Sequence, residues 1–357
     1  PLTDYAPLQR AAKGVLITQY DMGPIERLGL VKMDILAQRS LSIIEDTCHM
    51  VEANHGVQVC LDKIADGDAL TAETLRQGRT IGCFQIESPG MRNLLKMIRA
   101  ADCRDVIHAL SLIRPGPASS GMKERFVRRR LGEEPLVWAD PRLEELLGET
   151  YGVMLYQEDV LKVAHRLAGF PLEKADHLRK AMTKNRSGHN MLPLREEFVR
   201  GVLAGGGSRE LAESLWEQIA NFAGYSYCKA HACTYGQISY QTVWLKSRWP
   251  AEFLAAVLAN QAGYYEQREY LEEARRWGVP IRPPDVNSSD VECVARREEN
   301  DSSVVLRVGL RHVRSLTAHH AAQLVHERRR GGPYRSLDDL LLRVDLSREE
   351  TENLIRG

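Results

Sequence analysis

The chain has 357 residues, 43% of them hydrophobic and 27% charged, which is ordinary for a globular protein with a sizeable core. Its 48 basic and 48 acidic residues give a formal net charge of zero, so nucleic-acid binding through overall charge is disfavoured and only local basic clusters remain candidates. No apolar run is long enough to span a membrane, and the first residues are polar and mixed. We therefore expect neither a membrane span nor a signal peptide.

Seven cysteines are scattered along the chain without a CxxC pair. This usage is typical of a reducing compartment rather than of a disulfide framework, so we expect a cytoplasmic protein. Cys228, His231 and Cys233 lie close together, but a zinc site needs four ligands and no second pair follows them. We therefore expect no metal at this cluster.

Two short strands are expected first, at residues 15–20 and 29–36. In the second, Lys32 and Asp34 alternate with apolar residues and would share one face of the strand. The carboxylate is a candidate metal ligand, although nucleotidyl transfer needs two metals and more than one carboxylate. A salt bridge on a solvent-facing sheet is the plain structural alternative.

From residue 40 to about residue 260 the pattern is mainly helical. The expected helices cover residues 40–54, 71–77, 89–99, 104–112, 120–131, 142–147, 156–168, 172–183, 193–203, 208–223, 231–246 and 250–260. The Pro-rich stretch 279–285 then marks a boundary. Beyond it we expect a small β element over 291–309, followed by short helices at 315–330, 336–342 and 347–355.

Two basic stretches have residues suited to a phosphate chain. Arg114 precedes a Pro-Gly-Pro sequence that would hold its guanidinium rigidly, although such a sequence is usually only a turn. Arg179 and Lys180 are adjacent on a helix, where an anionic partner would relieve their repulsion; an exposed basic helix end is the alternative.

The segment 222–246 predicts a helix with a polar stripe, made of His231, Tyr235, Ser239, Thr242 and Lys246. Lys229 stands where this helix begins. A helix N-terminus beside a lysine and a histidine suits a triphosphate. A helix with a partly buried polar face explains the same pattern, so both interpretations stay open.

The order of these segments resembles the C-family DNA polymerases, which comprise the bacterial DNA polymerase III alpha subunits and their error-prone relatives. The motifs that carry the resemblance are GLVKMDIL (29–36), IGCFQIES (81–88), RPGP (114–117), YQE (156–158), LRKAM (178–182), FAGY (222–225), KAH (229–231), SYQT (239–242), PAEF (250–253) and PPDVN (283–287). So many separate motifs in family order argue strongly against a chance match.

The resemblance implies a palm with a nucleotidyltransferase fold, in which Asp34 would be the last metal-binding aspartate and Lys32 would lie in the active site. The metal would be Mg²⁺ in the intact enzyme, and the primer 3′ hydroxyl would attack the α-phosphorus of the nucleotide. The family's other metal-binding aspartates lie upstream of the matching strand. We therefore expect this sequence to be a piece of a longer enzyme and to be inactive by itself.

The resemblance also implies sites for nucleotide and DNA. The nucleotide-binding candidates are Arg114, Arg179, Lys180, Lys229, His231 and Tyr235. From about residue 290 the chain resembles a helix-hairpin-helix region, which commonly has hairpin glycines whose amides meet phosphate. Residues 313–316 contain no glycine, so Arg311 and Arg314 would supply charge instead. Lys123, Arg128 and Arg129 are further candidates for DNA contact.

We therefore expect a mainly α fold. Residues 1–39 would be the end of the palm with a small β remnant, 40–284 the helical fingers, and 285–357 the helix-hairpin-helix region. The expected function is that of part of a DNA-directed DNA polymerase, with primer–template DNA and deoxynucleoside triphosphates as partners. A sliding clamp and other replication or repair proteins would bind outside this chain. A non-catalytic DNA-binding or interaction module is the alternative, whereas the dispersed histidines give little support to a metal-dependent hydrolase.

Overall fold

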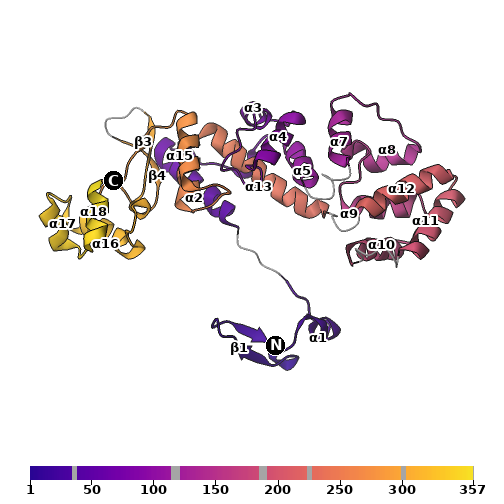
Figure 1. Cartoon of the computed structure of the whole chain (residues 1–357), viewed down its shortest axis with the longest axis horizontal. Helices are drawn as coiled ribbons and strands as arrows, with labels where there is room; N and C mark the ends of the chain where they lie inside the picture. Colours follow the sequence, from indigo (N-terminus) through magenta and orange to yellow (C-terminus); the bar gives the residue numbers. More distant parts are fainter. Residues whose placement is uncertain (34–37, 114–120, 185–190, 223–226, 299–302, 357) are drawn as a thin grey trace. The chain divides into compact units, whose positions relative to one another are not determined.

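The computed structural model describes the chain except for residues 34–37, 114–120, 185–190, 223–226, 299–302 and 357 (Figure 1). The chain divides into two compact units, Pro1–Gln38 and Arg39–Gly357. The first unit contains an antiparallel strand pair in which Leu8 is opposite Thr18. Its elements are η1 (Leu2–Asp4), β1 (Leu8–Arg10), β2 (Leu16–Thr18) and α1 (Met22–Arg27).

The strand expected over residues 29–36 is wrong for its described part. Residues 30–33 have no regular structure, and the side chains of Val31 and Met33 are 82% and 78% exposed. A strand needs a neighbour that satisfies its backbone hydrogen bonds. Among the described residues of the first unit, β1 and β2 pair only with each other, and neither forms a strand pair with residues 30–33.

The second unit is mainly helical, as expected, and its helix bounds agree with the sequence pattern to within about three residues. Its first helices are α2 (Arg39–His55), α3 (Ala69–Arg76), α4 (Pro89–Met97), α5 (Cys103–Leu112), α7 (Met122–Arg130) and α8 (Pro141–Leu147), with short turns η2 (Leu61–Lys63) and η3 (Gly148–Thr150). Next come α9 (Gln157–Arg166), α10 (Leu172–Lys184), α11 (Leu192–Ala204), α12 (Arg209–Phe222), α13 (Lys229–Arg248) and α14 (Pro250–Ala259). Helix α15 (Gln267–Arg276) was not expected.

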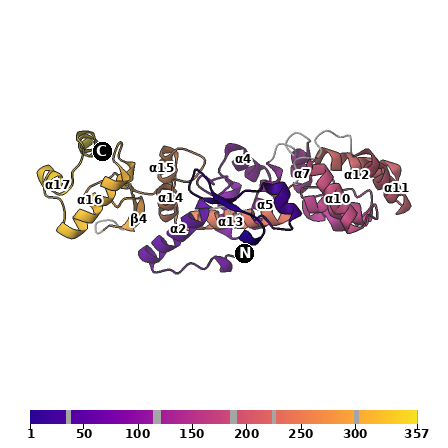
Figure 2. The same cartoon turned by 90° about the horizontal axis from the view of Figure 1, so that it is seen from below.

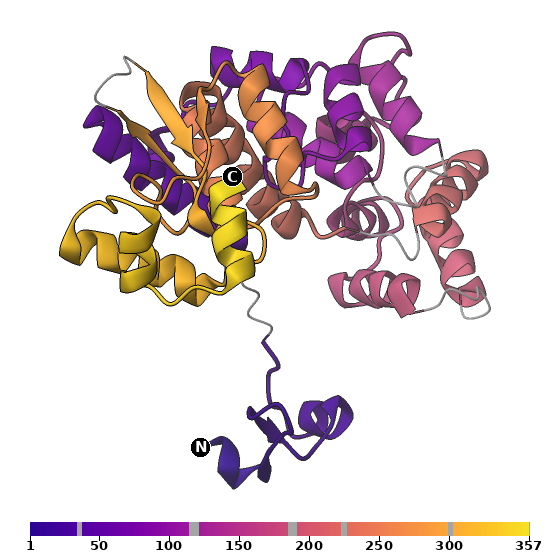
Figure 3. The ribbon, with the colours of Figure 1, turned by 60° about the vertical axis from the view of Figure 1, so that its left-hand side comes forward.

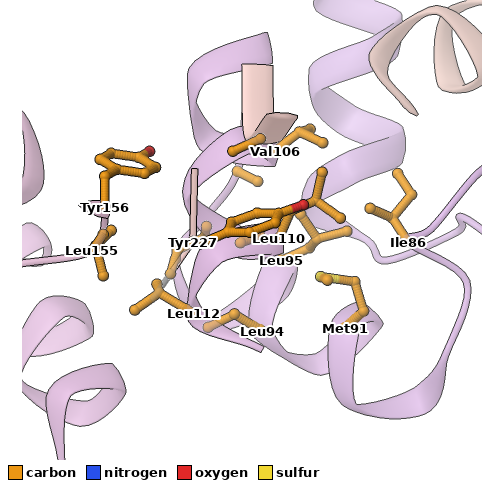
Figure 4. Packing of buried hydrophobic residues seen from close by; sticks show 14 of the residues in the cluster. Ile86, Met91, Leu94, Leu95, Val106, Leu110, Leu112, Leu155, Tyr156 and Tyr227 are labelled. Carbon is orange, nitrogen blue, oxygen red and sulfur yellow. The ribbon is translucent and has the colours of Figure 1, made fainter. Parts of the chain in front are cut away.

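Helix α13 packs against α2, α3, α5 and α14 and so organises the middle of this unit (Figure 2). Its contact with α5 depends on Gly236, because a Cβ atom there would lie 2.3 Å from Cγ1 of Ile107. Apolar side chains from these helices form one continuous core, to which α4 and α5 contribute Leu94, Leu95 and Leu110 (Figure 4). Packing on several sides therefore limits which side chains α13 can carry.

The small β element expected over 291–309 is confirmed. Strands β4 (Val294–Arg297) and β5 (Val304–Arg307) are antiparallel, and their polar turn lies outside the described residues. A short strand that was not expected, β3 (Ile281–Arg282), pairs with β5 in parallel.

Three short helices complete the chain and pack on one another (Figure 3). They are α16 (Ala318–Gly331), α17 (Leu337–Arg343) and α18 (Arg348–Arg356), preceded by the turn η4 (Leu310–His312). Leu310, Leu324 and Tyr334 belong to their buried cluster, which is separate from the larger core.

Candidate functional site

Two consecutive residues of the YQE motif connect cations that are far apart in the sequence. Gln157 begins α9, and its Oε1 accepts a hydrogen bond from Nη1 of Arg179 in α10 (2.9 Å). Oε2 of Glu158 accepts the backbone N–H of Lys229, the first residue of α13 (3.0 Å). The backbone N–H of Gln157 also donates to the carbonyl of Tyr227 (2.9 Å). The structure therefore holds Arg179 and Lys229 at the same end of α9.

A carboxylate of the same helix neutralises the basic pair on α10, Arg179 and Lys180. Asp176 Oδ1 lies 2.8 Å from Nε of Arg179, and Asp176 Oδ2 lies 2.8 Å from Nζ of Lys180. Hydrogen bonds from Lys180 and Arg179 hold the pKa of Asp176 below its ordinary value. The Lys180 side chain is 62% exposed. An exposed ion pair of this kind contributes little stability, so a polyanion can replace Asp176 at small cost.

Lys229 is also paired with a carboxylate. Its Nζ lies 2.6 Å from Oε2 of Glu149 and 5.4 Å from the ring centroid of Tyr156. Burial raises the pKa of Glu149, but the hydrogen bond and charge of Lys229 outweigh this effect and lower it. Sequence reasoning missed Glu149, Asp176, Gln157 and Glu158 as site residues. Only Asp176 has a local signal, its i, i+4 spacing with Lys180.

Four aromatic side chains form a row along the first turns of α13, which we call the aromatic column: Tyr227, His231, Tyr235 and Phe84. The rings of Tyr227 and His231 meet edge to face, with centroids 5.4 Å apart. The His231 and Tyr235 centroids are 4.0 Å apart, and those of Tyr235 and Phe84 are 5.1 Å apart. His231 is exposed, Tyr235 and Phe84 are half-buried, and Tyr227 is buried.

The later turns of α13 hold the segment around Phe84 by hydrogen bonds. Ser239 Oγ donates to the carbonyl of Phe84 (2.7 Å), and Thr242 Oγ1 accepts the backbone N–H of Phe84 (3.3 Å). Both hydroxyl residues are buried. These two members of the predicted polar stripe therefore have a structural role.

Lys246, the last member of the stripe, is completely buried. Its Nζ donates to the carbonyls of Arg79 (2.9 Å) and Ile81 (2.6 Å) and to Oε1 of Glu273 (2.7 Å). Burial lowers the pKa of Lys246, whereas the charge of Glu273 counteracts that effect. The interpretation as a partly buried polar face is thus confirmed for Ser239, Thr242 and Lys246.

The described residues do not bring together the candidates Lys32, Asp34 and Arg114. Lys32 is exposed within the irregular residues 30–33, and Asp34 and Arg114 lie outside the described residues. In the part of the chain that the structure describes, no group of three or more His, Cys, Asp and Glu side chains lies close enough to hold a metal. This part of the chain does not by itself fit a metal ion.

The DNA-contact candidates on α7 are engaged to different degrees. Arg129 is 18% exposed and binds Glu134 Oε1 (2.8 Å) and the carbonyl of Tyr151 (3.0 Å), so it fastens the segment that follows α7. Arg128 is more exposed and pairs with the same Glu134 (3.2 Å), while Lys123 pairs with its neighbour Glu124 (3.2 Å). Arg128 is therefore the most accessible of the three.

The hairpin over residues 313–316 has the backbone of a glycine turn without a glycine. Ser315 has a φ of 62°, in the left-handed region where glycine is favoured. Arg314 is exposed, whereas Arg311 pairs with Glu292 (2.7 Å). Of the two arginines expected to replace hairpin amides, Arg314 is thus the one better placed to meet a phosphate.

The backbone amide that follows this hairpin is occupied by a carboxylate of the same chain. Oε1 of Glu350, in α18, accepts the N–H of Thr317 (3.1 Å) and lies 2.7 Å from Nδ1 of His320. Burial raises the pKa of Glu350, but hydrogen bonds from His320, Thr317 and Ser347 outweigh it and lower the pKa to about 2. Glu350 therefore supplements the cap that Thr317 provides at the start of α16.

None of the described helices is long and apolar enough to cross a bilayer. Three family models match the chain. The model of the bacterial DNA polymerase III alpha subunit finger domain matches residues 40–206. The model of the bacterial DNA polymerase III alpha NTPase domain matches residues 1–37, and a helix-hairpin-helix motif matches residues 278–357.

Curated relatives match over almost the whole chain. The DNA polymerase III subunit alpha of Thermus aquaticus is 38% identical over 366 residues, which covers 100% of this chain and 29% of the relative. That of Aquifex aeolicus is 35% identical and covers 96% of this chain and 29% of the relative. The error-prone DNA polymerase of Symbiobacterium thermophilum is 35% identical, with 96% and 33% covered. The chain spans about three tenths of the length of these relatives, and it belongs to the family of bacterial DNA polymerase III alpha subunits and their error-prone relatives.

Proposed function

We propose that this chain acts as part of a DNA-directed DNA polymerase in the cytoplasm. Residues 1–39 would contribute to the palm, 40–284 would form the fingers, and 285–357 would form the helix-hairpin-helix region. The observation that carries the proposal is the connection of Arg179 and Lys229 through Gln157 and Glu158, because it gathers cations from two helices at one place. Family membership supports the same assignment.

The gathered cations suit the triphosphate of an incoming deoxynucleotide. Arg179, Lys180 and Lys229 each pair with a carboxylate, and these pairs are partly or largely exposed. A triphosphate would replace Asp176 and Glu149 as the anion, so the cations would neutralise charge on the pyrophosphate that leaves. His231, exposed beside Lys229, would contact the same group.

Asp34 would contribute to the binding of Mg²⁺ in the palm, with Lys32 beside it. A divalent metal supplies charge neutralisation for phosphoryl transfer when bound. The experiment is Asp34→Asn in the polymerase that carries this sequence, with Asp21→Asn as a control at the preceding aspartate of the sequence. We expect Asp34→Asn to lower primer extension at least about 100-fold while duplex binding persists, because charge stabilisation in the transition state is lost. Extension equal to that of the Asp21→Asn control would refute the assignment.

Contact with the DNA backbone would use Arg314 and Arg128, although Arg128 is paired with Glu134. Lys123, Arg129 and Arg311, which are paired and less exposed than Arg128, would contribute more weakly. Duplex binding to the chain should fall as salt rises, because phosphate contacts release counterions. A salt titration by fluorescence anisotropy measures this slope for the wild type and for Arg314→Ala. Affinity that does not change with salt would contradict the DNA-contact proposal.

A catalytic part and a non-catalytic DNA-binding module give different results with nucleotide. The chain with a primed template, magnesium and deoxynucleotides should show no primer extension, yet it should bind deoxynucleotide. Extension by the pure chain would contradict its proposed dependence on the rest of a palm. Salt-dependent duplex binding without any nucleotide binding would favour the non-catalytic module.

A further inference from the structure

The aromatic column has one accessible ring and three rings that are covered to some degree. His231 is exposed, whereas Tyr235 and Phe84 are half-buried and Tyr227 is buried. The imidazole therefore has an aromatic neighbour on each side, at 5.4 Å and 4.0 Å between ring centroids. Contact on two sides restricts the rotamers of an otherwise exposed side chain.

Both ends of the aromatic column are fixed to the protein by backbone hydrogen bonds. At one end, the carbonyl of Tyr227 accepts the N–H of Gln157, and the backbones of Tyr227 and Tyr156 pair in an isolated parallel β-bridge. At the other end, Ser239 and Thr242 hold the carbonyl and the N–H of Phe84. The column is thus supported from α9 and from the later turns of α13, and not only by contacts between rings.

We infer that Tyr235 and Phe84 are positioning residues, which act on nucleotide binding by fixing the imidazole of His231. This inference rests on the proposed role of His231 in nucleotide binding. Tyr235 contacts the imidazole directly. The Phe84 ring contacts Tyr235, with centroids 5.1 Å apart, and lies outside the group of Arg179, Lys180 and Lys229. A ring that is already in place loses less rotamer freedom when a ligand binds, so affinity is gained without a new contact.

The test is the affinity of the chain for dATP with magnesium, measured by isothermal titration calorimetry. Tyr235→Leu removes the stacking ring, and we expect it to weaken dATP binding by about 3- to 10-fold, the cost of immobilising one side chain. Tyr235→Phe, which keeps the ring, should restore most of the affinity. Phe84→Leu should have a smaller effect in the same direction. Tyr264→Leu removes an exposed ring that contacts Tyr265 outside the column and is the matched control.

A second measurement reports on the column without nucleotide. In the wild-type chain, the ring protons of His231 should be shifted upfield in the NMR spectrum by the nearby Tyr235 ring, and Tyr235→Leu should remove this shift. Circular dichroism melting shows whether each variant is folded, and Phe84→Leu replaces Tyr235→Leu in the comparison if the latter is not.

The two proposals fail in different ways. If His231→Ala leaves dATP affinity unchanged, the proposed role of His231 in nucleotide binding is wrong. If His231→Ala weakens binding but folded Tyr235→Leu and Phe84→Leu do not, only the positioning role is wrong. Loss of affinity in Tyr235→Phe equal to that in Tyr235→Leu would also overturn the inference, because the effect would then come from the hydroxyl.

Discussion

The first turns of α13 and its last turns differ in what surrounds residues of the same chemical type. His231 is exposed and Tyr235 half-buried in the turns that follow Lys229, the first residue of the helix. Ser239, Thr242 and Lys246 are buried and bind backbone groups of the segment around Phe84. Helical spacing places polar residues on one face of a helix, but the elements packed around that face decide whether they meet solvent or carbonyl groups. Under the proposed function, nucleotide binding would therefore use the first turns of α13, whereas its last turns hold the fold together.

The largest expected effect on this comparison comes from Lys246→Met. The change leaves the carboxylate of Glu273 and two carbonyls without their buried donor, which should lower the free energy of unfolding by about 3–5 kcal/mol. Urea denaturation measures this, with Lys180→Met as the control at an exposed, paired lysine, where we expect a change within about 0.5 kcal/mol. Equal effects of the two substitutions would remove the distinction between the buried and the accessible cations.

Glu350→Gln should extend the comparison to the C-terminal helices. We expect a loss of about 1–3 kcal/mol in the free energy of unfolding at pH 7, because His320 and Thr317 lose a charged acceptor. The exposed neighbour Glu349, which accepts a hydrogen bond from Ser315, is the matched control as Glu349→Gln. A substitution at position 349 that costs more than the one at position 350 would contradict the capping role.

The pH dependence of the Glu350→Gln effect has a defined sign. The pKa of Glu350 is lowered from 4.5 to about 2 in the folded chain, so its stabilisation is present above pH 4.5. It is lost as the pH falls from 4.5 towards 2, because protonation then becomes coupled to unfolding. The difference between wild type and variant should therefore shrink over this range. A difference that grows on acidification would show that the carboxylate is not the stabilising form.

Ser239→Ala is the smallest of the expected stability effects. Its hydroxyl lies within hydrogen-bonding distance of the carbonyls of Phe84 and Tyr235 and has one proton to donate between them, so its loss should cost about 1 kcal/mol. Thr234→Ala, on the exposed side of the same helix, should change stability by less than about 0.5 kcal/mol. Thermal melting of both variants provides the comparison.

Much of the fold follows from the local pattern, because caps, prolines and glycines bound nearly every helix. The strand over residues 29–36 was wrong where it is described, since alternation alone cannot supply a pairing neighbour. The cations Arg179 and Lys229 were predicted, but their partners Gln157 and Glu149 were not. These partners are distant in sequence, and only the packing of α10 on α9 and of α13 beside η3 brings them together. Glu350 escaped prediction for the same reason.

The central claim is that the first turns of α13 bind the incoming nucleotide. Steady-state incorporation by the polymerase that carries this sequence tests it through the KM for dATP in His231→Ala. We predict a rise of about 10-fold in KM, equivalent to one charge-assisted hydrogen bond, together with an unchanged melting temperature. An unchanged KM and rate in a folded His231→Ala enzyme would contradict the account.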